Sequence, residues 1–238
     1  MPENAWSAVV FDVDGTLVDS ERDGHRVCFN ASFAAFGLPY RWDVATYGRL
    51  LAITGGRRRI ATFLQSQGHA APEALDLATR LHKDKTSRMR DFVTEGTISP
   101  RPGVRQLLAD LREAGVRLAV ATTGTREWAE PLLRRLFGDE MFTLVLTGTE
   151  VPELKPDPAV YTEALRRLDV PAERALAVED SRNGLRSALA AGMPCVVVTN
   201  EYTAGSDFTG AAAVYDSFEA CRADRSGPLW SGPRLRAG

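Results

Sequence analysis

The sequence is poor in the features that mark several large classes of protein. Its three cysteines, Cys28, Cys195 and Cys221, are odd in number, widely spaced and form no metal-ligand pattern, so we expect reduced structural thiols and a cytoplasmic location. No apolar run approaches the roughly 20 residues of a membrane helix, and residues 1–6 lack the basic and apolar segments of a signal peptide. The formal net charge of -2 argues against nucleic-acid binding by bulk electrostatics. We therefore expect no membrane or nucleic-acid partner, and a monomer rather than an oligomer.

The residues that are present have the balance of an ordinary globular protein. Hydrophobic residues make up 44% and charged residues 25% of the chain. With 238 residues, the chain is long enough for a sizeable core and a smaller second domain.

One stretch near the N-terminus places charge where packing alone would not. The run FDVDGTLVDS at residues 11–20 follows the apolar residues 8–11, which predict a buried strand. Asp12 and Asp14 stand two residues apart, so both carboxylates can face the same way, and Gly15 lets the chain turn sharply. Two carboxylates at the end of a buried strand repel each other and are costly to desolvate. The stretch therefore predicts a chemical site that supplies a cation or keeps one carboxyl protonated.

The remainder of the chain has two different rhythms. Between residues 21 and 97 the pattern predicts helices alone, over 22–36, in short pieces at 47–51 and 59–64, and over 72–92. Later, strands expected at 116–122, 143–147, 175–179 and 195–199 alternate with helices at 104–114, 126–137, 159–168 and 185–191. Within the second of these helices, Pro131 is expected to distort or restart it.

This alternation predicts an α/β fold. We expect a Rossmann-like, doubly wound parallel sheet with an all-helical cap domain inserted after the first strand. The expected boundaries are residues 1–20 and 98–221 for the core, 21–97 for the cap, and 222–238 for a loose C-terminal tail.

Polar groups follow successive strands of the predicted sheet. Ligands of open parallel sheets bind beyond the carboxyl ends of the strands. The residues at those ends are Asp12 and Asp14, then Thr122, Thr123 and Gly124, then Lys155 in the loop after the third strand, and finally Glu179 and Asp180. Taken singly, each has a structural explanation: Thr122 as a helix cap, Lys155 as a solvated lysine, Glu179 with Asp180 as the polar end of a strand. Their order at successive strand ends favours a shared chemical site.

Such a set suits a phosphoryl group. Asp12 and Asp180 would hold Mg²⁺ through oxygen atoms, and Lys155 would offset the remaining negative charge. The Thr122 hydroxyl and the amides of Thr123 and Gly124 would donate to phosphate oxygens near a helix start.

The two aspartates of the first motif would divide the chemistry between them. Asp12 would attack phosphorus to give an aspartyl phosphate. Asp14 would protonate the leaving oxygen and later activate water.

These four motifs resemble those of the haloacid-dehalogenase superfamily of phosphohydrolases, over about residues 8–210. The helical insert is similar to the small cap of the β-phosphoglucomutase-like branch. The resemblance implies Mg²⁺ bound by the Asp12 carboxylate, the Asp14 backbone carbonyl and Asp180, with Glu179 beside them. Because dehalogenases of the superfamily lack the second aspartate, Asp14 favours phosphoryl transfer.

The insert, together with two later segments, resembles the CbbY-type phosphatases, which include hydrolases of xylulose bisphosphate. The segments that carry the resemblance are Asp23–Arg26, Phe29–Asn30, Trp42–Asp43, Thr54–Arg57, Leu81–Thr86, Tyr202–Thr203 and Asp207–Phe208. It implies substrate contacts at Glu21, His25, Gly55 and Gly56. The family has Lys where Arg57 stands, which keeps the charge but changes its geometry.

The arginines at residues 57–59 support an anion partner independently. They follow Thr54-Gly55-Gly56, which predicts a loop entering a helix, and cations are unfavourable at a helix N-terminus. We expect Arg57 or Arg59, with Lys85, to hold a second phosphate or another anionic group of the substrate. A solvated basic face, or pairing with acids of the insert, is the alternative.

The sequence therefore predicts a Mg²⁺-dependent phosphatase that acts on a small phosphorylated sugar, with xylulose bisphosphate as the first candidate. One alternative is a sugar phosphomutase, which would return the phosphoryl group to the sugar. Another is a non-catalytic metabolite-binding protein on the same fold.

Overall fold

The computed structural model describes residues 6–232, in which six parallel strands form one sheet in the order β3-β2-β1-β4-β5-β6. The strands are β1 (Ala8–Phe11), β2 (Arg117–Ala121), β3 (Leu144–Leu146), β4 (Ala175–Glu179), β5 (Cys195–Val198) and β6 (Ala213–Tyr215). Central β1 pairs with β2 on one side, Ala8 beside Arg117, and with β4 on the other, Ala8 beside Ala175. The chain changes direction across the sheet between β1 and β4, which is where such sheets bind ligands.

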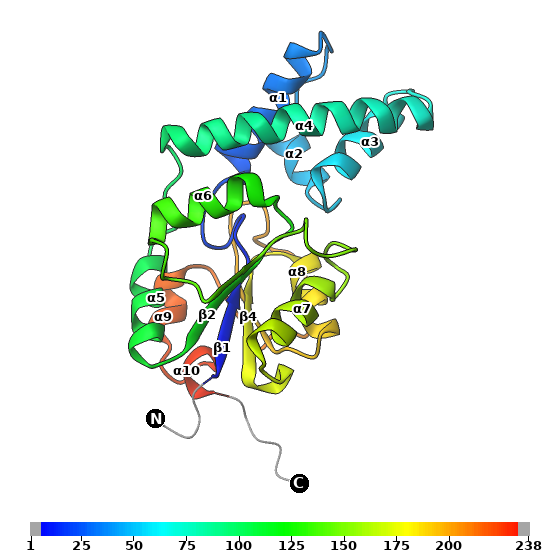
Figure 1. The fold of residues 1–238 in the computed structure, drawn as a ribbon. Coiled ribbons are helices and arrows are strands. Elements are labelled where there is room, and N and C mark those ends of the chain that lie inside the picture. Colours follow the sequence, from blue (N-terminus) through cyan, green and yellow to red (C-terminus); the bar gives the residue numbers. More distant parts are fainter. Residues whose placement is uncertain (1–5, 233–238) are drawn as a thin grey trace.

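Alternating side chains of β1 divide the core into two layers. Val9 and Phe11 join the apolar cluster under α5 (Val104–Glu113), α6 (Arg126–Phe137), α9 (Phe218–Ala223) and α10 (Pro228–Ser231). Ala8 and Val10 join the opposite cluster, under α7 (Ala159–Leu168) and α8 (Arg182–Ala190). A strand with both faces buried reads as a continuous apolar run. Figure 1 shows the two helical layers on either side of the sheet, and the predicted α/β class is confirmed.

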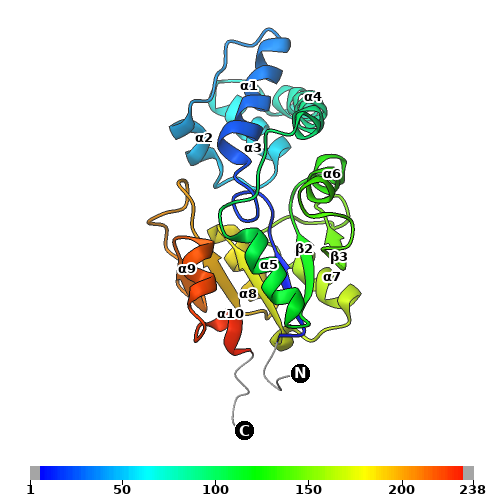
Figure 2. The same cartoon turned by 90° about the vertical axis from the view of Figure 1, so that its left-hand side faces the viewer.

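The segment between β1 and α5 is helical where it is regular. It contains a short π-helix, η1 (Glu21–His25), followed by α1 (Arg26–Ala35), α2 (Val44–Leu50), α3 (Gly56–Ser66) and α4 (Ala71–Glu95). We call residues 21–97 the helical insert. It has an apolar cluster of its own around Phe33, Trp42 and Leu64. It lies beyond the carboxyl ends of the strands, at the opposite end of the molecule from α10 (Figures 1 and 2).

Helix α4 connects the insert to the sheet layers. Its N-terminal half, with Leu81, packs in the cluster of the insert, whereas Met89 and Val93 belong to the cluster beneath α6. Figure 1 shows α4 crossing over α6. The insert is therefore anchored on one side by packing as well as by its two connections.

Several local expectations need correction. The edge strand β6 was not predicted, because it has three residues and its side chains are only partly buried. Helix α8 begins at Arg182 instead of residue 185, since Ser181 caps it by accepting the Gly184 amide at 3.1 Å. Helix α6 runs unbroken through Pro131.

The expectation of a loose tail from residue 222 is wrong for its described part. Leu229 of α10 is buried in the core, and the Trp6 indole donates to the Pro228 carbonyl at 2.8 Å. Residues 233–238 of the expected tail, and residues 1–5 at the other end, lie outside the described residues.

A 3₁₀ turn, η2 (Ala172–Arg174), precedes β4. No helix within residues 6–232 has the length and apolar character needed to span a bilayer.

Candidate active site

The turn after β1 carries the first predicted motif. Gly15 has φ of +83°, and a Cβ placed there would overlap the Asp180 carboxylate, so glycine is required. Arg101 ties this turn to the end of β5 by donating to the Gly15 carbonyl at 2.6 Å and to the Thr199 carbonyl at 2.5 Å. The turn is therefore held rigidly between β1 and β5, with Asp12 and Asp14 on it.

Lys155 is the fixed cation of the site. Its ammonium group lies 2.7 Å from Asp12 Oδ1 and 2.6 Å from Glu179 Oε1, and also donates to the Ala121 carbonyl. The Tyr161 hydroxyl donates to the same Glu179 oxygen at 2.6 Å. Burial alone would lower the pKa of Lys155, but Asp12 and Glu179 outweigh it and raise the pKa above its usual value. The alternative of a solvated loop lysine is wrong, because Lys155 is 4% exposed.

Three buried carboxylates form a cluster that fits a hard cation. Oxygens of Asp12, Glu179 and Asp180 all lie within 4.8 Å of one another. Burial raises the pKa of Asp12 well above its usual value, and burial with the neighbouring Glu179 charge raises the pKa of Asp180 to about 8. Lys155 thus leaves part of the negative charge uncompensated. Since Mg²⁺ prefers oxygen ligands, the donor set and the charge both suit it.

The end of β2 forms the neighbouring loop. The Thr122 hydroxyl accepts the Gly124 amide at 3.0 Å. Helix α6 takes Thr125, not Thr122, as its N-cap residue, so the alternative of Thr122 as that cap is wrong. Trp128, in the first turn of α6, packs so closely on Gly124 that a Cβ there would overlap the indole.

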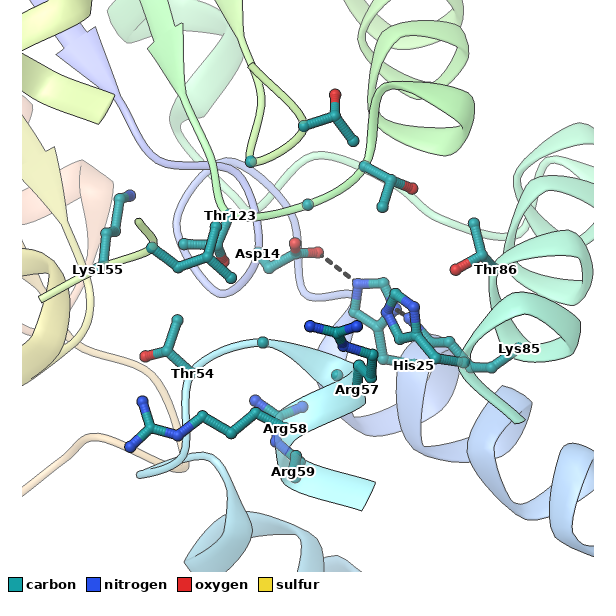
Figure 3. A pocket seen from close by; sticks show the side chains of 18 of the residues that line it. Asp14, His25, Thr54, Arg57, Arg58, Arg59, Lys85, Thr86, Thr123 and Lys155 are labelled. Atoms are coloured by element: carbon teal, nitrogen blue, oxygen red, sulfur yellow. Dashed lines mark hydrogen bonds and ion pairs between the residues drawn. The ribbon is translucent and has the colours of Figure 1, made fainter. Parts of the chain in front are cut away.

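The second aspartate belongs to a chain of polar groups that reaches into the insert. Asp14 Oδ1 lies 2.9 Å from His25 Nε2 and also accepts the Ser20 hydroxyl, and Lys85 Nζ lies 2.7 Å from His25 Nδ1. An ammonium group can only donate, so Nδ1 accepts and the proton of a neutral imidazole is on Nε2, facing Asp14 (Figure 3). Burial raises the pKa of Asp14, but His25 and then Ser20 outweigh it, and the net shift is downward.

The predicted arginines of the insert occupy different environments. Arg59 is buried and donates to the Leu50 and Ile53 carbonyls and to the Tyr47 hydroxyl. That hydroxyl donates in turn to Glu21 at 2.5 Å. Arg57 and Arg58 are exposed, and Figure 3 shows Arg57 pointing toward Asp14 and His25 while Arg58 extends away.

A cavity of about 580 Å³ lies between the insert and the carboxyl ends of the strands. Predicted residues that line it are Asp14, Glu21, His25, Gly55, Gly56, Arg57, Arg59, Lys85, Thr123, Gly124 and Lys155. A smaller cavity of about 110 Å³ shares several of these residues and adds Asp12 and Asp180. Of the predicted set, Thr122 and Glu179 line neither cavity and act from behind those that do.

Some residues of the site were not predicted. Asn200 donates to Asp180 Oδ2 at 2.7 Å and follows the strand predicted at 195–199, so its place at a strand end was the available signal. Tyr161 and Arg101 have no such signal, because their roles depend on contacts with residues 18 and 86 positions away.

Comparisons with known proteins agree with this geometry. The family model "haloacid dehalogenase-like hydrolase" matches residues 6–192. Protein CbbY of Cereibacter sphaeroides is 47% identical over 215 residues, covering 89% of this chain and 92% of that protein. The CBBY-like protein of Arabidopsis thaliana is 39% identical, covering 88% and 68%. The crystal structure of CbbY from Rhodobacter sphaeroides in complex with phosphate has a TM-score of 0.84 at 44% identity, covering 95% of this chain and 99% of that one.

The chain belongs to the haloacid dehalogenase-like hydrolases. Within that family it is a phosphatase similar to the CbbY proteins, so both predicted resemblances are confirmed. This assignment argues against the alternative of a non-catalytic binding protein.

Proposed function

We propose that the chain hydrolyses a small sugar bisphosphate with Mg²⁺ as cofactor, and that xylulose bisphosphate is the first substrate to test. The observation that carries the proposal is a cavity lined by both Lys155 and Arg57, which shares residues with a smaller cavity lined by Asp12 and Asp180. A structure of an Asp-to-Asn variant of Rhodobacter sphaeroides CbbY contains xylulose-(1,5)-bisphosphate, with a TM-score of 0.84 and 44% identity to this chain.

The metal would be held by the Asp12 and Asp180 carboxylates and the Asp14 backbone carbonyl. When bound, it would offset the negative charge of the carboxylates and of the phosphate. Lys155 orients Asp12 through its 2.7 Å contact, and Glu179 with Tyr161 keeps Lys155 in place.

Asp12 attacks phosphorus, the bond to the sugar oxygen breaks, and an aspartyl phosphate forms. Asp14 gives the departing oxygen a proton, which it takes from His25 Nε2 at 2.9 Å while the Lys85 ammonium group passes a proton to His25 Nδ1 at 2.7 Å, so that the imidazole stays neutral. In the second half, Asp14 accepts a proton from water as the water attacks phosphorus, and inorganic phosphate leaves. The helical insert acts as a cap that excludes bulk water meanwhile.

Arg57 is the better placed of the two arginines expected to bind a distal phosphate, because the Arg59 guanidinium already donates to three groups of the insert. The exposed Arg57 side chain instead faces the cavity, where it can bind an anionic group of the substrate. The cytoplasmic location, the monomeric state and the exact domain boundaries stay predictions.

The experiment is phosphate release with Mg²⁺ from a panel of sugar monophosphates and bisphosphates. Arg57→Ala should raise KM about 10- to 100-fold for a bisphosphate and little for a monophosphate, since a charge-assisted hydrogen bond contributes about 1.5–3 kcal/mol. Arg41→Ala, which removes an exposed arginine of the insert that does not line this cavity, is the matched control and should leave both nearly unchanged. Equal losses on both substrates, or full activity in Asp12→Asn, would contradict the proposal. Isomerised product without phosphate release would favour the phosphomutase alternative.

A further inference from the structure

Asn183 links the metal-binding end of β4 to the helical insert. It lies three residues after Asp180, in the first turn of α8. Its amide group donates to the Thr54 hydroxyl at 2.9 Å and to the Ala52 carbonyl at 3.1 Å, both in the loop before α3. Asn183 is thus joined to two residues that lie 129 and 131 positions earlier in the sequence. Asn183 and Thr54 both line the smaller cavity, and no step of the proposed chemistry uses their contact.

The loop that Asn183 holds leads to Arg57, the residue proposed to bind the distal group of the substrate. Thr54, Gly55 and Arg57 all line the cavity. Leu154, on the opposite loop and next to Lys155, packs against Gly55, where a Cβ would lie 3.0 Å from the Leu154 side chain. Any movement of the 52–56 loop away from Asn183 would therefore carry Arg57 away from the phosphate end.

A second contact reaches the insert from the other segment beside Asp180. Tyr202 packs on Gly48, where a Cβ would lie 2.8 Å from its ring, and its ring centroid lies 6.2 Å from that of Tyr47. Asn200, two residues earlier, donates to Asp180. Both segments that border Asp180 therefore also touch the insert.

These contacts lie on the side away from the packing of α4 on α6. Met89 and Val93 fix the C-terminal half of α4 to the sheet layers, so an opening movement would separate the Asn183 side most. The Asn183 contact is polar and half-buried, with two hydrogen bonds, and can break and re-form in water at little cost.

We propose that Asn183 is a positioning residue whose hydrogen bonds to Thr54 and Ala52 latch the helical insert over the cavity and set Arg57 for the distal group of the substrate. The kinetic part of its test rests on the proposed hydrolysis of a sugar bisphosphate; the distance measurement does not.

The kinetic test compares two substrates. Asn183→Ala should lower kcat/KM for xylulose bisphosphate about tenfold, mainly through KM, because two net hydrogen bonds are lost. Hydrolysis of p-nitrophenyl phosphate, which has no distal group, should change less than about threefold. Thr54→Val should act in the same direction but more weakly, because the hydrogen bond from Asn183 to the Ala52 carbonyl remains. The double variant should be no worse than Asn183→Ala, and Thr54→Ser should behave as wild type. Equal losses on both substrates, additive single effects, or no effect would overturn the proposal.

The second test measures the position of the insert directly. Leu75 on α4 and Leu189 on α8 are 51% and 39% exposed, and the three native cysteines are buried. Spin labels at Leu75→Cys and Leu189→Cys would report the distance between insert and sheet layers by pulsed electron paramagnetic resonance, with Mg²⁺ and no sugar. Asn183→Ala should shift the distribution to longer distances, and Thr54→Ser should not. An unchanged distribution would refute the latch, whereas a wild-type enzyme inactive on the bisphosphate, with the shift present, would refute only the proposed substrate.

Discussion

Gly184 offers a sharp test of how the buried charges are supported. It lies in the first turn of α8 directly above Glu179, and a Cβ there would overlap the Glu179 carboxylate. On helix propensity alone, Gly184→Ala would stabilise the protein by up to about 1 kcal/mol. The structure predicts the opposite, because Glu179 is 1% exposed and cannot move without losing its partners.

The magnitude follows from those partners. Lys155 and Tyr161 each donate to Glu179 at 2.6 Å. Hydrogen bonds to a charged group contribute about 1.5–3 kcal/mol each, and partial loss of both, less the propensity gain, leaves a destabilisation of about 2–4 kcal/mol. For a chain of this length that lowers Tm by about 5–15 °C. Because Lys155 also orients Asp12, kcat should fall at least tenfold.

The assay is urea or thermal unfolding, with phosphate release measured on the same preparations. Gly24→Ala is the matched control for stability, since Gly24 is also helical but a Cβ there would meet Phe92 at an ordinary 3.4 Å. It should change the free energy of unfolding by less than about 1 kcal/mol. A Gly184→Ala protein as stable as wild type would refute the reasoning, because it would mean that Glu179 yields without cost.

Three further outcomes are expected. Tyr161→Phe removes one hydrogen bond to Glu179 and should cost about 1–2 kcal/mol in urea unfolding, with kcat lowered several-fold and the fold unchanged by circular dichroism. Burial, with Lys85 and Arg57 nearby, lowers the pKa of His82 to about 4, below its value in the unfolded chain. The unfolded state therefore binds a proton more readily than the folded state does. The free energy of unfolding should fall by about 1–3 kcal/mol as pH drops from 6.5 to 4. His82→Gln should flatten that slope, and an unchanged slope would refute the assignment. Chelation with EDTA should abolish phosphate release, and adding Mg²⁺ should restore it. Mg²⁺ should also raise Tm, since a cation relieves the repulsion among Asp12, Glu179 and Asp180. A Tm that does not change with Mg²⁺ would argue against the metal site.

The sheet and the polar residues at its carboxyl edge could be predicted from the sequence, because both leave local patterns in it. The buried strands are unbroken apolar runs such as Ala8–Phe11, and parallel strands bring their carboxyl ends together whatever the details. Strand β6 was not predicted because it is an edge strand of only three residues, of which the central one, Val214, is exposed, and so it lacks such a run.

Contacts between distant segments were beyond such reasoning. Arg59 and Arg57 stand two residues apart in the same basic run, yet one is buried by carbonyls of the insert and the other faces the cavity. Nothing local distinguishes them, since the difference arises from how the loop before α3 folds back on its helix. The Asn183–Thr54 contact is of the same kind.

The division of α4 between two apolar clusters has a consequence for how such enzymes can be recombined. Leu81 packs with the insert, whereas Met89 and Val93, about two and three turns further along the same unbroken helix, pack with the sheet layers. A chimera that exchanges residues 21–97 as a block would import half of a foreign interface with α6. A junction placed inside α4, between residues 82 and 88, would transfer the substrate-facing surface while leaving the recipient's own interface intact.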